Sequence, residues 1–251
     1  MIPELAQAIE RAEPVVLATV IRTFRSVPRR PGSKMLIFAD GRTIGTIGGG
    51  EMEHRVAVEA ANVLSTNEPI VVKYELVDPA DGHAGVCGGE AEIYLEPYMP
   101  KPTILVIGAG HVGRAVCGLA SWLNFRTVVW DDRPDAADGV EDADAKLSGS
   151  LSDALSRHEV TAETSVVMVT RNVALDLEIL PVLFATPAKY IGLMGSTRRW
   201  ETTREGLVKL GIGDDQIARV QAPIGIEIKA ETPEEIAVSI IAEVIGSRNG
   251  A

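Results

Sequence analysis

The sequence has little cysteine and fewer basic than acidic residues. Cys87 and Cys117 are the two cysteines among 251 residues, too few for a disulfide-stabilised scaffold and not spaced as a structural zinc site requires. Lysine and arginine number 24 against 35 aspartates and glutamates, for a formal net charge of −11. This charge argues against a broad surface for nucleic acid or anionic membranes.

Long hydrophobic runs are also missing. No run approaches the ~18 apolar residues that a membrane span needs. The first residues, Met1–Glu4, lack the basic stretch and apolar core that begin a signal peptide. We therefore expect a soluble, cytoplasmic protein without nucleic-acid or membrane partners.

Glycine, by contrast, is concentrated in one part of the chain. Eleven of the 24 glycines lie between Gly45 and Gly113, in three clusters. The clusters are Gly45/Gly48/Gly49/Gly50, Gly82/Gly85/Gly88/Gly89 and Gly108/Gly110/Gly113. Such density is typical of turns, or of backbone that a ligand approaches closely.

Hydrophobic periodicity divides the chain into two domains. Expected strands at 15–21, 34–38, 70–76 and 91–95, an expected hairpin over 35–47, and helices at 3–11 and 51–64 predict a small α+β domain at 1–98. Three prolines between Pro97 and Pro102 indicate an extended linker at 99–102. From Thr103, short apolar runs alternate with helical patterns, which predicts an α/β domain at 103–251: a Rossmann-like parallel sheet with helices on both faces. Its expected strands are 104–107, 128–130, 166–169 and 190–193, and its expected helices are 111–122, 151–158, 173–184, 197–210 and 232–245.

The third glycine cluster lies where an apolar strand leads into a helix. Gly108, Gly110 and Gly113 form the pattern GxGxxG, and Asp131 follows eighteen residues after the last glycine. In a Rossmann fold these glycines allow a tight turn, close approach of a pyrophosphate and close helix packing, and the acid binds a ribose hydroxyl. The pattern predicts a dinucleotide site with His111 beside the phosphate. Asp131 has an alternative interpretation as a turn residue at a strand end.

Basic residues gather ahead of the first glycine cluster. Thirteen positions hold five basic residues and no acid: Arg22, Arg25, Arg29, Arg30 and Lys34. In a chain of net charge −11, this local reversal indicates an anion site, for example for a phosphate. A solvated basic loop is the alternative.

Cys87 lies between glycines of the second cluster. The exposed amides of such a loop can lower the pKa of a thiol and leave it accessible to a ligand. An incidental loop cysteine is the alternative. Cys117, inside the predicted helix after Gly113, is expected to be a small core residue.

Several segments, in one order, resemble a single family over nearly the whole chain. They are 26–35, 45–53, 86–89, 108–113, 131–134, 190–196, 222–225 and 230–237. In these segments the sequence resembles the XdhC/CoxI family, the accessory proteins of xanthine dehydrogenase and related molybdenum hydroxylases. The resemblance implies an N-terminal family domain followed by a C-terminal Rossmann domain.

The resemblance also implies a function. It implies a chaperone, rather than a turnover enzyme, that binds molybdenum cofactor (molybdopterin), keeps it during sulfuration and delivers it to an apo-hydroxylase. A cysteine desulfurase is the second expected partner, and a homodimer is expected. The family's glycine-rich motifs correspond to Gly48, Gly49, Gly50 and Glu51 and to Cys87, Gly88 and Gly89. Candidates for the cofactor's phosphate are Arg29, Arg30 and Lys34, and Cys87 is the candidate catalytic residue, as sulfur donor or metal contact.

The chain departs from the family pattern in two places. Many members carry a cysteine where this chain has Glu51, so Cys87 is the only candidate thiol in that site. The segment 170–176 lacks a histidine that several relatives carry.

Two other functions stay open. An NAD(P)-dependent oxidoreductase would use the Rossmann site, but the sequence offers no convincing acid or base for it among His54, His83, His111 and His158. A nucleotide-sensing regulatory subunit is the third interpretation.

Overall fold

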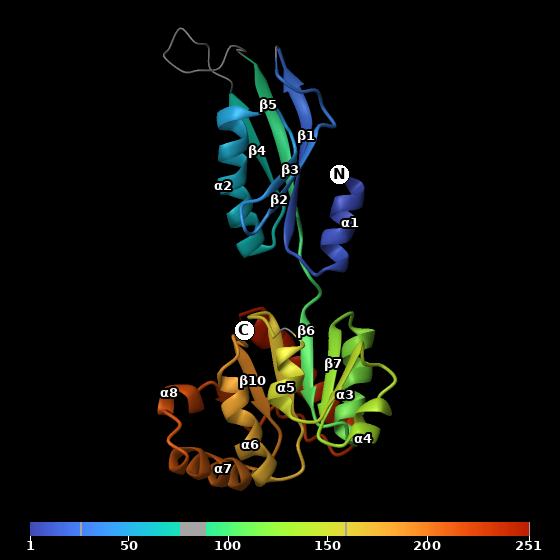
Figure 1. The fold of residues 1–251 in the computed structure, drawn as a ribbon, viewed down its shortest axis with the longest axis vertical. Coiled ribbons are helices and arrows are strands. Elements are labelled where there is room, and N and C mark those ends of the chain that lie inside the picture. The colour runs from blue at the N-terminus through green and yellow to red at the C-terminus, as the bar shows by residue number, and fades with distance from the viewer. Residues whose placement is uncertain (26, 76–88, 159, 251) are drawn as a thin grey trace. The chain divides into compact units, whose positions relative to one another are not determined.

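Apolar residues of β1 (Val15–Phe24) form the centre of the sheet in the first of two units, Met1–Pro100 and Lys101–Ala251. The structure is a computed structural model that describes residues 1–25, 27–75, 89–158 and 160–250. The sheet of the first unit is antiparallel, in the order β3-β2-β1-β5-β4 (Figure 1). Its remaining elements are α1 (Ile2–Glu10), β2 (Lys34–Phe38), β3 (Thr43–Gly45), α2 (Gly50–Thr66), β4 (Ile70–Glu75) and β5 (Glu90–Tyr98).

Both faces of β1 are covered. Successive residues of a strand point to opposite faces of its sheet, so Val16, Ala18 and Val20 pack in the α2 cluster while Val15 and Leu17 pack in the α1 cluster. The helix α2 contributes an apolar stripe at helical spacing: Met52, Val56, Ala60 and Val63. Figure 1 shows α1 and α2 on opposite sides of the sheet.

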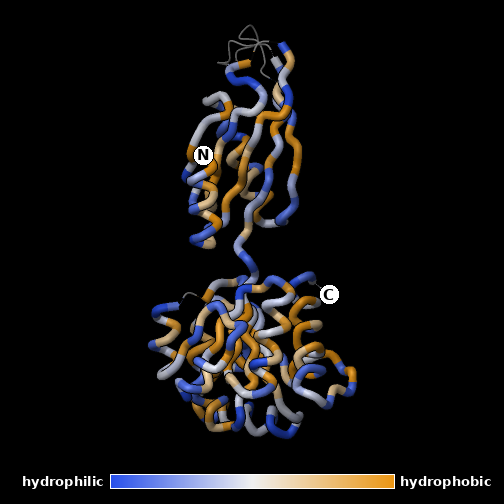
Figure 2. The backbone as a smooth tube through the Cα atoms, turned by 90° about the vertical axis from the view of Figure 1, so that its right-hand side faces the viewer, coloured by the Kyte–Doolittle hydropathy of each residue, from blue (hydrophilic) through white to orange (hydrophobic). Residues whose placement is uncertain are grey.

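The second unit contains a six-stranded parallel sheet in the order β11-β10-β9-β6-β7-β8. Counted within the unit, this is the Rossmann order, with the first strand, β6, beside the fourth, β9. Figure 2 shows the hydrophobic residues along these strands. The strands are β6 (Thr103–Ile107), β7 (Arg126–Asp131), β8 (Ala145–Ser148), β9 (Thr164–Met168), β10 (Tyr190–Leu193) and β11 (Val220–Gln221).

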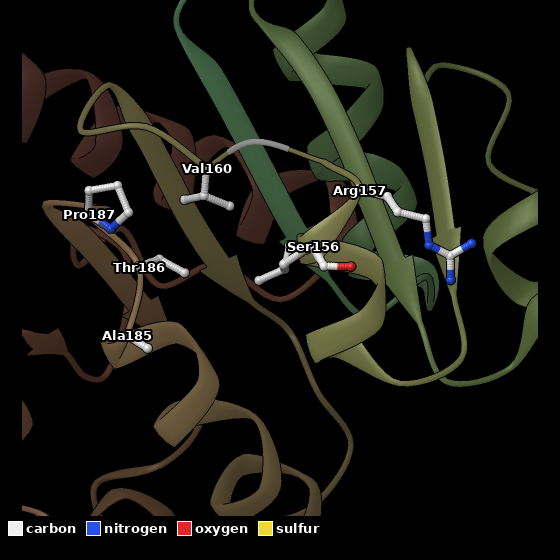
Figure 3. Close-up of a pocket in the computed structure, with 7 residues that line it drawn as sticks. Ser156, Arg157, Val160, Ala185, Thr186 and Pro187 are labelled. Atoms are coloured by element: carbon white, nitrogen blue, oxygen red, sulfur yellow. The ribbon is translucent and has the colours of Figure 1, made fainter.

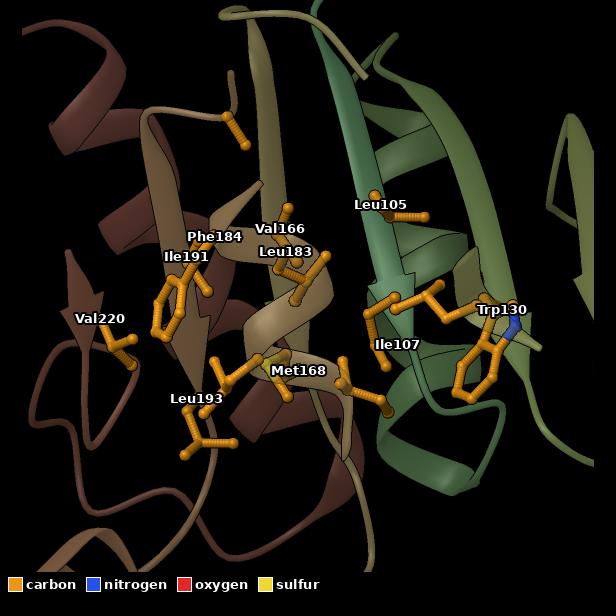
Figure 4. Packing of buried hydrophobic residues seen from close by; sticks show 14 of the residues in the cluster. Leu105, Ile107, Trp130, Val166, Met168, Leu183, Phe184, Ile191, Leu193 and Val220 are labelled. Atoms are coloured by element: carbon orange, nitrogen blue, oxygen red, sulfur yellow. The ribbon is translucent and has the colours of Figure 1, made fainter. Parts of the chain in front are cut away.

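Helices cover both faces of this sheet. On one face, α3 (His111–Trp122) and α9 (Pro233–Arg248) pack against Ile104, Val106 and Val129. On the other face, α5 (Leu151–Ser156) and α6 (Val173–Phe184) pack around Leu105, Ile107 and Trp130 (Figure 4). The predicted fold class, a Rossmann-like parallel sheet preceded by an α+β part, is confirmed.

Several element boundaries differ from those predicted. The strand β1 is longer than expected, and α9 continues to Arg248. The expected helix at 197–210 is α7 (Thr197–Lys209). Short elements that were not predicted are α4 (Pro134–Asp138), β8, α8 (Asp214–Ile217) and β11. Elements this short do not complete enough periods for a hydrophobic pattern to be recognised.

No helix in the described ranges combines the length and the hydrophobicity that crossing a membrane requires.

A buried ion pair joins α6, α7 and the residues that follow β9. Asp176 of α6 is fully buried, and its Oδ2 accepts a hydrogen bond from Arg199 Nε at 2.9 Å. Arg199 Nη1 donates to the main-chain oxygen of Thr170 at 2.9 Å, and the Thr170 hydroxyl donates to the Asp176 carboxylate. This network fixes the carboxyl end of β9, which borders the predicted dinucleotide site.

We predict that Asp176→Ala destabilises the second unit. The substitution leaves the largely buried Arg199 guanidinium without its counter-ion, which costs about 3–5 kcal/mol of unfolding free energy. Urea unfolding followed by circular dichroism measures this loss. Glu178→Ala, at an exposed position of the same helix, is the control and should change stability by less than about 0.5 kcal/mol. Equal stability of the two variants would contradict the assigned role of the pair.

Candidate functional site

The three glycines of the GxGxxG pattern have different structural roles at the end of β6. Gly108 has a φ of +114°, and a Cβ on it would lie 2.8 Å from the main-chain oxygen of Val169. A Cβ on Gly113 would lie 1.9 Å from the oxygen of Gly108. A Cβ on Gly110, in contrast, has no described heavy atom within 4 Å. Two glycines are therefore required by the fold, and the third leaves open space in front of the turn.

The helix α3 begins at this turn with Gly110 as its N-cap. In the described structure no side chain caps it, and its first internal hydrogen bond runs from Arg114 N to Gly110 O, at 2.9 Å. The amides of the first helical turn have no partner within a helix and bind anions readily. His111 is exposed at the first position of this helix.

Asp131 lies beside the glycine turn and holds it in place. Its side chain is 2% exposed, and Oδ2 accepts a hydrogen bond from Ala109 N at 2.8 Å. Arg133 donates to the same carboxylate from N at 3.0 Å, Nε at 2.9 Å and Nη2 at 3.0 Å. Burial alone raises the pKa of Asp131, but the hydrogen bonds from Arg133 and Ala109 outweigh it and keep this pKa well below its usual range.

The sequence thus located the acid but missed its partner, Arg133. Both oxygens of Asp131 already accept hydrogen bonds. A ribose hydroxyl can therefore bind Asp131 only if it displaces the Arg133 guanidinium. The signal was the adjacency of Asp131, Asp132 and Arg133 at a strand end. Cys117 is fully buried among apolar residues of α3, as predicted, and burial raises its pKa to about 12.

In the first unit, the predicted loops attach to one end of the sheet. Phe24, the last residue of β1, pairs with Glu90, the first residue of β5. Glu75, the last residue of β4, pairs with the same Glu90. Because the strands are antiparallel, the segment 25–33, the segment 46–49 and the segment 76–89 all leave the sheet at this end. The segments that carry Arg29 and Arg30 and the first two glycine clusters are therefore connected to one end of this sheet.

Glu53 of α2 organises the first glycine cluster. Its Oε1 accepts hydrogen bonds from the Thr46 hydroxyl at 2.6 Å, from Ile47 N at 3.0 Å and from Gly49 N at 2.9 Å. Partial burial raises the pKa of Glu53, but these hydrogen bonds are stronger in effect and lower it below the usual value. The loop amides at Ile47 and Gly49 consequently face a carboxylate of the protein itself. The amides that follow, from Gly50 and Glu51, belong to the first turn of α2, where Glu51 is exposed.

The basic cluster does not form one site: Arg22 pairs with Glu92 at 3.4 Å, and Arg29 and Arg30 lie apart from Lys34. Pro28 lies 3.5 Å from a Cβ built on Gly48, which brings the segment of Arg29 and Arg30 against the first glycine cluster. Both arginines are exposed and have no ion-pair partner among the described residues. Lys34 lies elsewhere: its Nζ donates to Thr19 Oγ1 at 3.0 Å, on the sheet face opposite α2.

The remaining predicted residues are only partly described. Gly89 is buried directly before β5, whereas Cys87 and Gly88 lie outside the described residues. A surface pocket of about 490 Å³ lies between the ends of α5 and α6, lined by Leu155, Ser156, Arg157, Val160, Ala185, Thr186 and Pro187 (Figure 3). These segments precede β9 and β10, so the pocket is at the amino edge of the sheet, away from the glycine turn.

Comparison with known proteins identifies the family. Residues 104–244 match the XdhC Rossmann domain, and residues 8–75 match the XdhC and CoxI family. The chain belongs to the XdhC/CoxI family. Neither match covers residues 76–103, which include Cys87.

Relatives of this XdhC/CoxI protein differ in length. It is 31% identical to the uncharacterized protein YqeB of Escherichia coli (strain K12), across 99% of this chain and 46% of YqeB. It thus spans less than half of that relative. It is 22% identical to the molybdenum cofactor insertion chaperone PaoD of the same organism, across 96% of this chain and 86% of PaoD. The chain is also similar to the crystal structure of a xanthine dehydrogenase from Bacillus halodurans. The two sequences are 25% identical, the match covers 98% of this chain and 95% of the Bacillus chain, and the structures superimpose with a TM-score of 0.53.

We predict that Gly110→Ala separates ligand binding from folding in this XdhC/CoxI protein. Because a methyl group at Gly110 meets only open space, unfolding free energy should change by less than about 0.5 kcal/mol. If the turn binds NAD⁺ as the GxGxxG pattern predicts, the same methyl group blocks the approach of the pyrophosphate, and affinity for NAD⁺ should fall by roughly ten-fold or more. Gly113→Ala, which overlaps the Gly108 oxygen, should instead cost about 3 kcal/mol of stability. Calorimetric titration and urea unfolding test both variants; unchanged NAD⁺ affinity in Gly110→Ala would exclude this binding mode.

We also predict that Glu53→Ala loosens the first glycine cluster. Removal of the acceptor leaves two amides and a hydroxyl without their protein partner and should cost about 1–2 kcal/mol at pH 7. Because the folded pKa of Glu53 is lowered, its contribution is present above the unfolded value of about 4.3 and disappears as pH falls through the folded value. Stability measured from pH 7 to pH 3 should therefore show the parent and variant converging in acid. Glu68→Ala, exposed beyond α2, is the control, and a gap between parent and Glu53→Ala that does not narrow as the pH falls would contradict the assignment.

Proposed function

We propose that this XdhC/CoxI protein is an accessory chaperone that binds molybdenum cofactor, assists its sulfuration and inserts it into a xanthine dehydrogenase-type hydroxylase. The observation that carries the proposal is the family match of both halves of the chain. The relationship to PaoD, a molybdenum cofactor insertion chaperone, supports it over 96% of this chain. Its partners in this proposal are the apo-hydroxylase and a cysteine desulfurase, and the active form is a cytoplasmic homodimer.

The residues at the loop end of the first unit fit the anionic part of such a cofactor. Molybdopterin carries a phosphate, a dithiolene and a flat hydrogen-bonding ring. Exposed arginines without an acidic partner suit a phosphate, and Arg29 and Arg30 meet that description beside Gly48. Glu53 already binds the amides of Ile47 and Gly49, so we assign the phosphate to the arginines and to the first turn of α2, near Gly50. Lys34, on the opposite face, has no place in this assignment.

The sulfur chemistry is assigned to Cys87. Glu51 occupies the position of the cysteine found in many relatives, so the site has a single candidate thiol. The segment that carries Cys87 joins Glu75 and Glu90, at the same end of the sheet as Arg29 and Arg30. When bound, the cofactor would supply the metal and the labile sulfur, and the protein would bind, orient and shield it.

A second proposal concerns the glycine turn after β6: we propose that it binds NAD or NADP. The open space in front of Gly110 and the uncapped start of α3 favour this ligand. Dinucleotide binding in that case regulates the accessory function. An NAD(P)-dependent oxidoreductase is the rival, and steady consumption of NADH or NADPH by the purified protein would favour it.

The cofactor proposal makes a prediction about two arginines. Replacement of Arg29 and Arg30 together by alanine removes two charge-assisted contacts with the phosphate, so affinity for isolated molybdenum cofactor should fall about ten-fold. Cys87→Ala should bind the cofactor but yield less of its sulfurated form with a cysteine desulfurase. Absorbance titration and activation of an apo-hydroxylase measure the two effects.

Arg11→Ala provides the matched control. Arg11 is exposed at the end of α1, and its removal changes the net charge without touching the loop end of the sheet. Cofactor affinity of the double variant equal to that of the parent would contradict the proposal.

A further inference from the structure

An ion pair links the loops that follow β7 and β9. Arg171 Nη1 donates to Asp132 Oδ1 at 2.7 Å, and Arg171 Nη2 donates to Asp132 Oδ2 at 2.6 Å. The two residues are 39 positions apart in the sequence, and their side chains are 48% and 34% exposed. A bidentate ion pair of this kind fixes the distance between the two loops, and each side chain neutralises the charge of the other.

The strand order places this contact across the end of β6. In the sheet, β6 lies between β7 and β9. The end of β7, which leads directly into Asp132, holds the glycine turn from one side, because Gly108 N donates to Trp130 O at 2.7 Å. The loop after β9 closes on it from the other side, because a Cβ on Gly108 would lie 2.8 Å from Val169 O. The pair of Asp132 and Arg171 therefore bridges the two walls that flank the glycine turn.

A ligand of this fold would need the space that the pair spans. Dinucleotides bind outside the carboxyl ends of the strands, where the strand order reverses, with the adenosine ribose next to the acid that ends the second strand. Here the reversal lies between β6 and β9, and that acid is Asp131. We propose that the Asp132–Arg171 ion pair is a latch across the adenosine end of this crevice, and that it opens when an adenine dinucleotide binds. This inference rests on the proposal that the glycine turn binds NAD or NADP.

The surroundings of the latch allow it to open without unfolding the site. The main-chain oxygen of Thr170 is held by Arg199 Nη1, and the buried Asp131 is held by Ala109 N. The backbone on both sides is thus anchored by buried groups. The latch opens when the side chains of Asp132 and Arg171 separate, and a ribose contact with Asp131 also displaces the exposed guanidinium of Arg133. Exposed ion pairs are weak enough for a ligand to displace them.

Two variants with opposite charge effects test the latch. Arg171→Gln and Asp132→Asn both break the pair, but the first removes a cation near an anionic ligand and the second leaves that cation free. NAD⁺ and NADP⁺ are titrated separately into the parent and both variants by calorimetry. If the pair is a latch, both variants should bind the preferred dinucleotide about two- to five-fold more tightly than the parent, because neither has to break an exposed ion pair first.

An exposed ion pair at the opposite edge of the same sheet supplies the control. Lys189 Nζ lies 3.8 Å from Glu163 Oε1, before β10 and β9 respectively, and Lys189→Gln and Glu163→Gln should leave dinucleotide affinity unchanged.

Three outcomes overturn the latch. Tighter binding by Asp132→Asn but weaker binding by Arg171→Gln would make Arg171 a direct ligand contact instead. Equal affinity of the parent and both variants would leave the pair without a role in binding. Absence of dinucleotide binding in all three proteins would remove the proposed ligand together with the latch. None of these results bears on cofactor binding at Arg29 and Arg30, which is measured separately.

Discussion

The hydrogen bond between the buried carboxylate of Asp131 and the amide of Ala109 is the contact on which the second unit's site depends. It ties the end of β7 to the turn that follows β6, and the turn in turn sets where α3 begins. A buried charge of this kind is tolerated because its remaining acceptor positions are filled by Arg133. Without the carboxylate, the amide of Ala109 would lose its partner, and the turn would keep the hydrogen bond from Gly108 N to Trp130 O and the close approach of Gly113 to Gly108. The position at which α3 begins follows from these contacts together.

The first unit uses a carboxylate in the same way. Glu53 binds the amides of Ile47 and Gly49, so part of the glycine loop is satisfied internally. Before α3, Asp131 likewise binds the amide of Ala109, and in the described structure no side chain caps the first turn of either α2 or α3. Glycine density alone therefore does not distinguish a loop that cradles an anion from one that is folded around an acid. In the proposed cofactor site of the first unit, the positive charge comes from the exposed Arg29 and Arg30 beside Gly48.

Much of this architecture is predictable from the sequence, and the exceptions have physical reasons. The helix α3 was predicted at its observed bounds because GxGxxG marks its start and a regular apolar stripe marks its length. The strand β8 was missed because four residues at a sheet edge, of which none is fully buried, leave no apolar run. Lys34 was grouped with Arg29 and Arg30 by distance along the chain. Strand alternation, however, turns the Lys34 side chain to the face that carries Thr19.

Contacts that depend on strand order were beyond the sequence. Asp132 and Arg171 come together only because β7 and β9 both neighbour β6, and the same order is compatible with many other residues at their positions. The ion pair between them is exposed, whereas the pair of Asp176 and Arg199 directly behind it is buried. Two ion pairs in adjacent segments thus differ in what they can do. The buried pair cannot separate without a large loss of stability, so it anchors the wall of the crevice. The exposed pair separates at little cost, so it is the one of the two that can respond to a ligand.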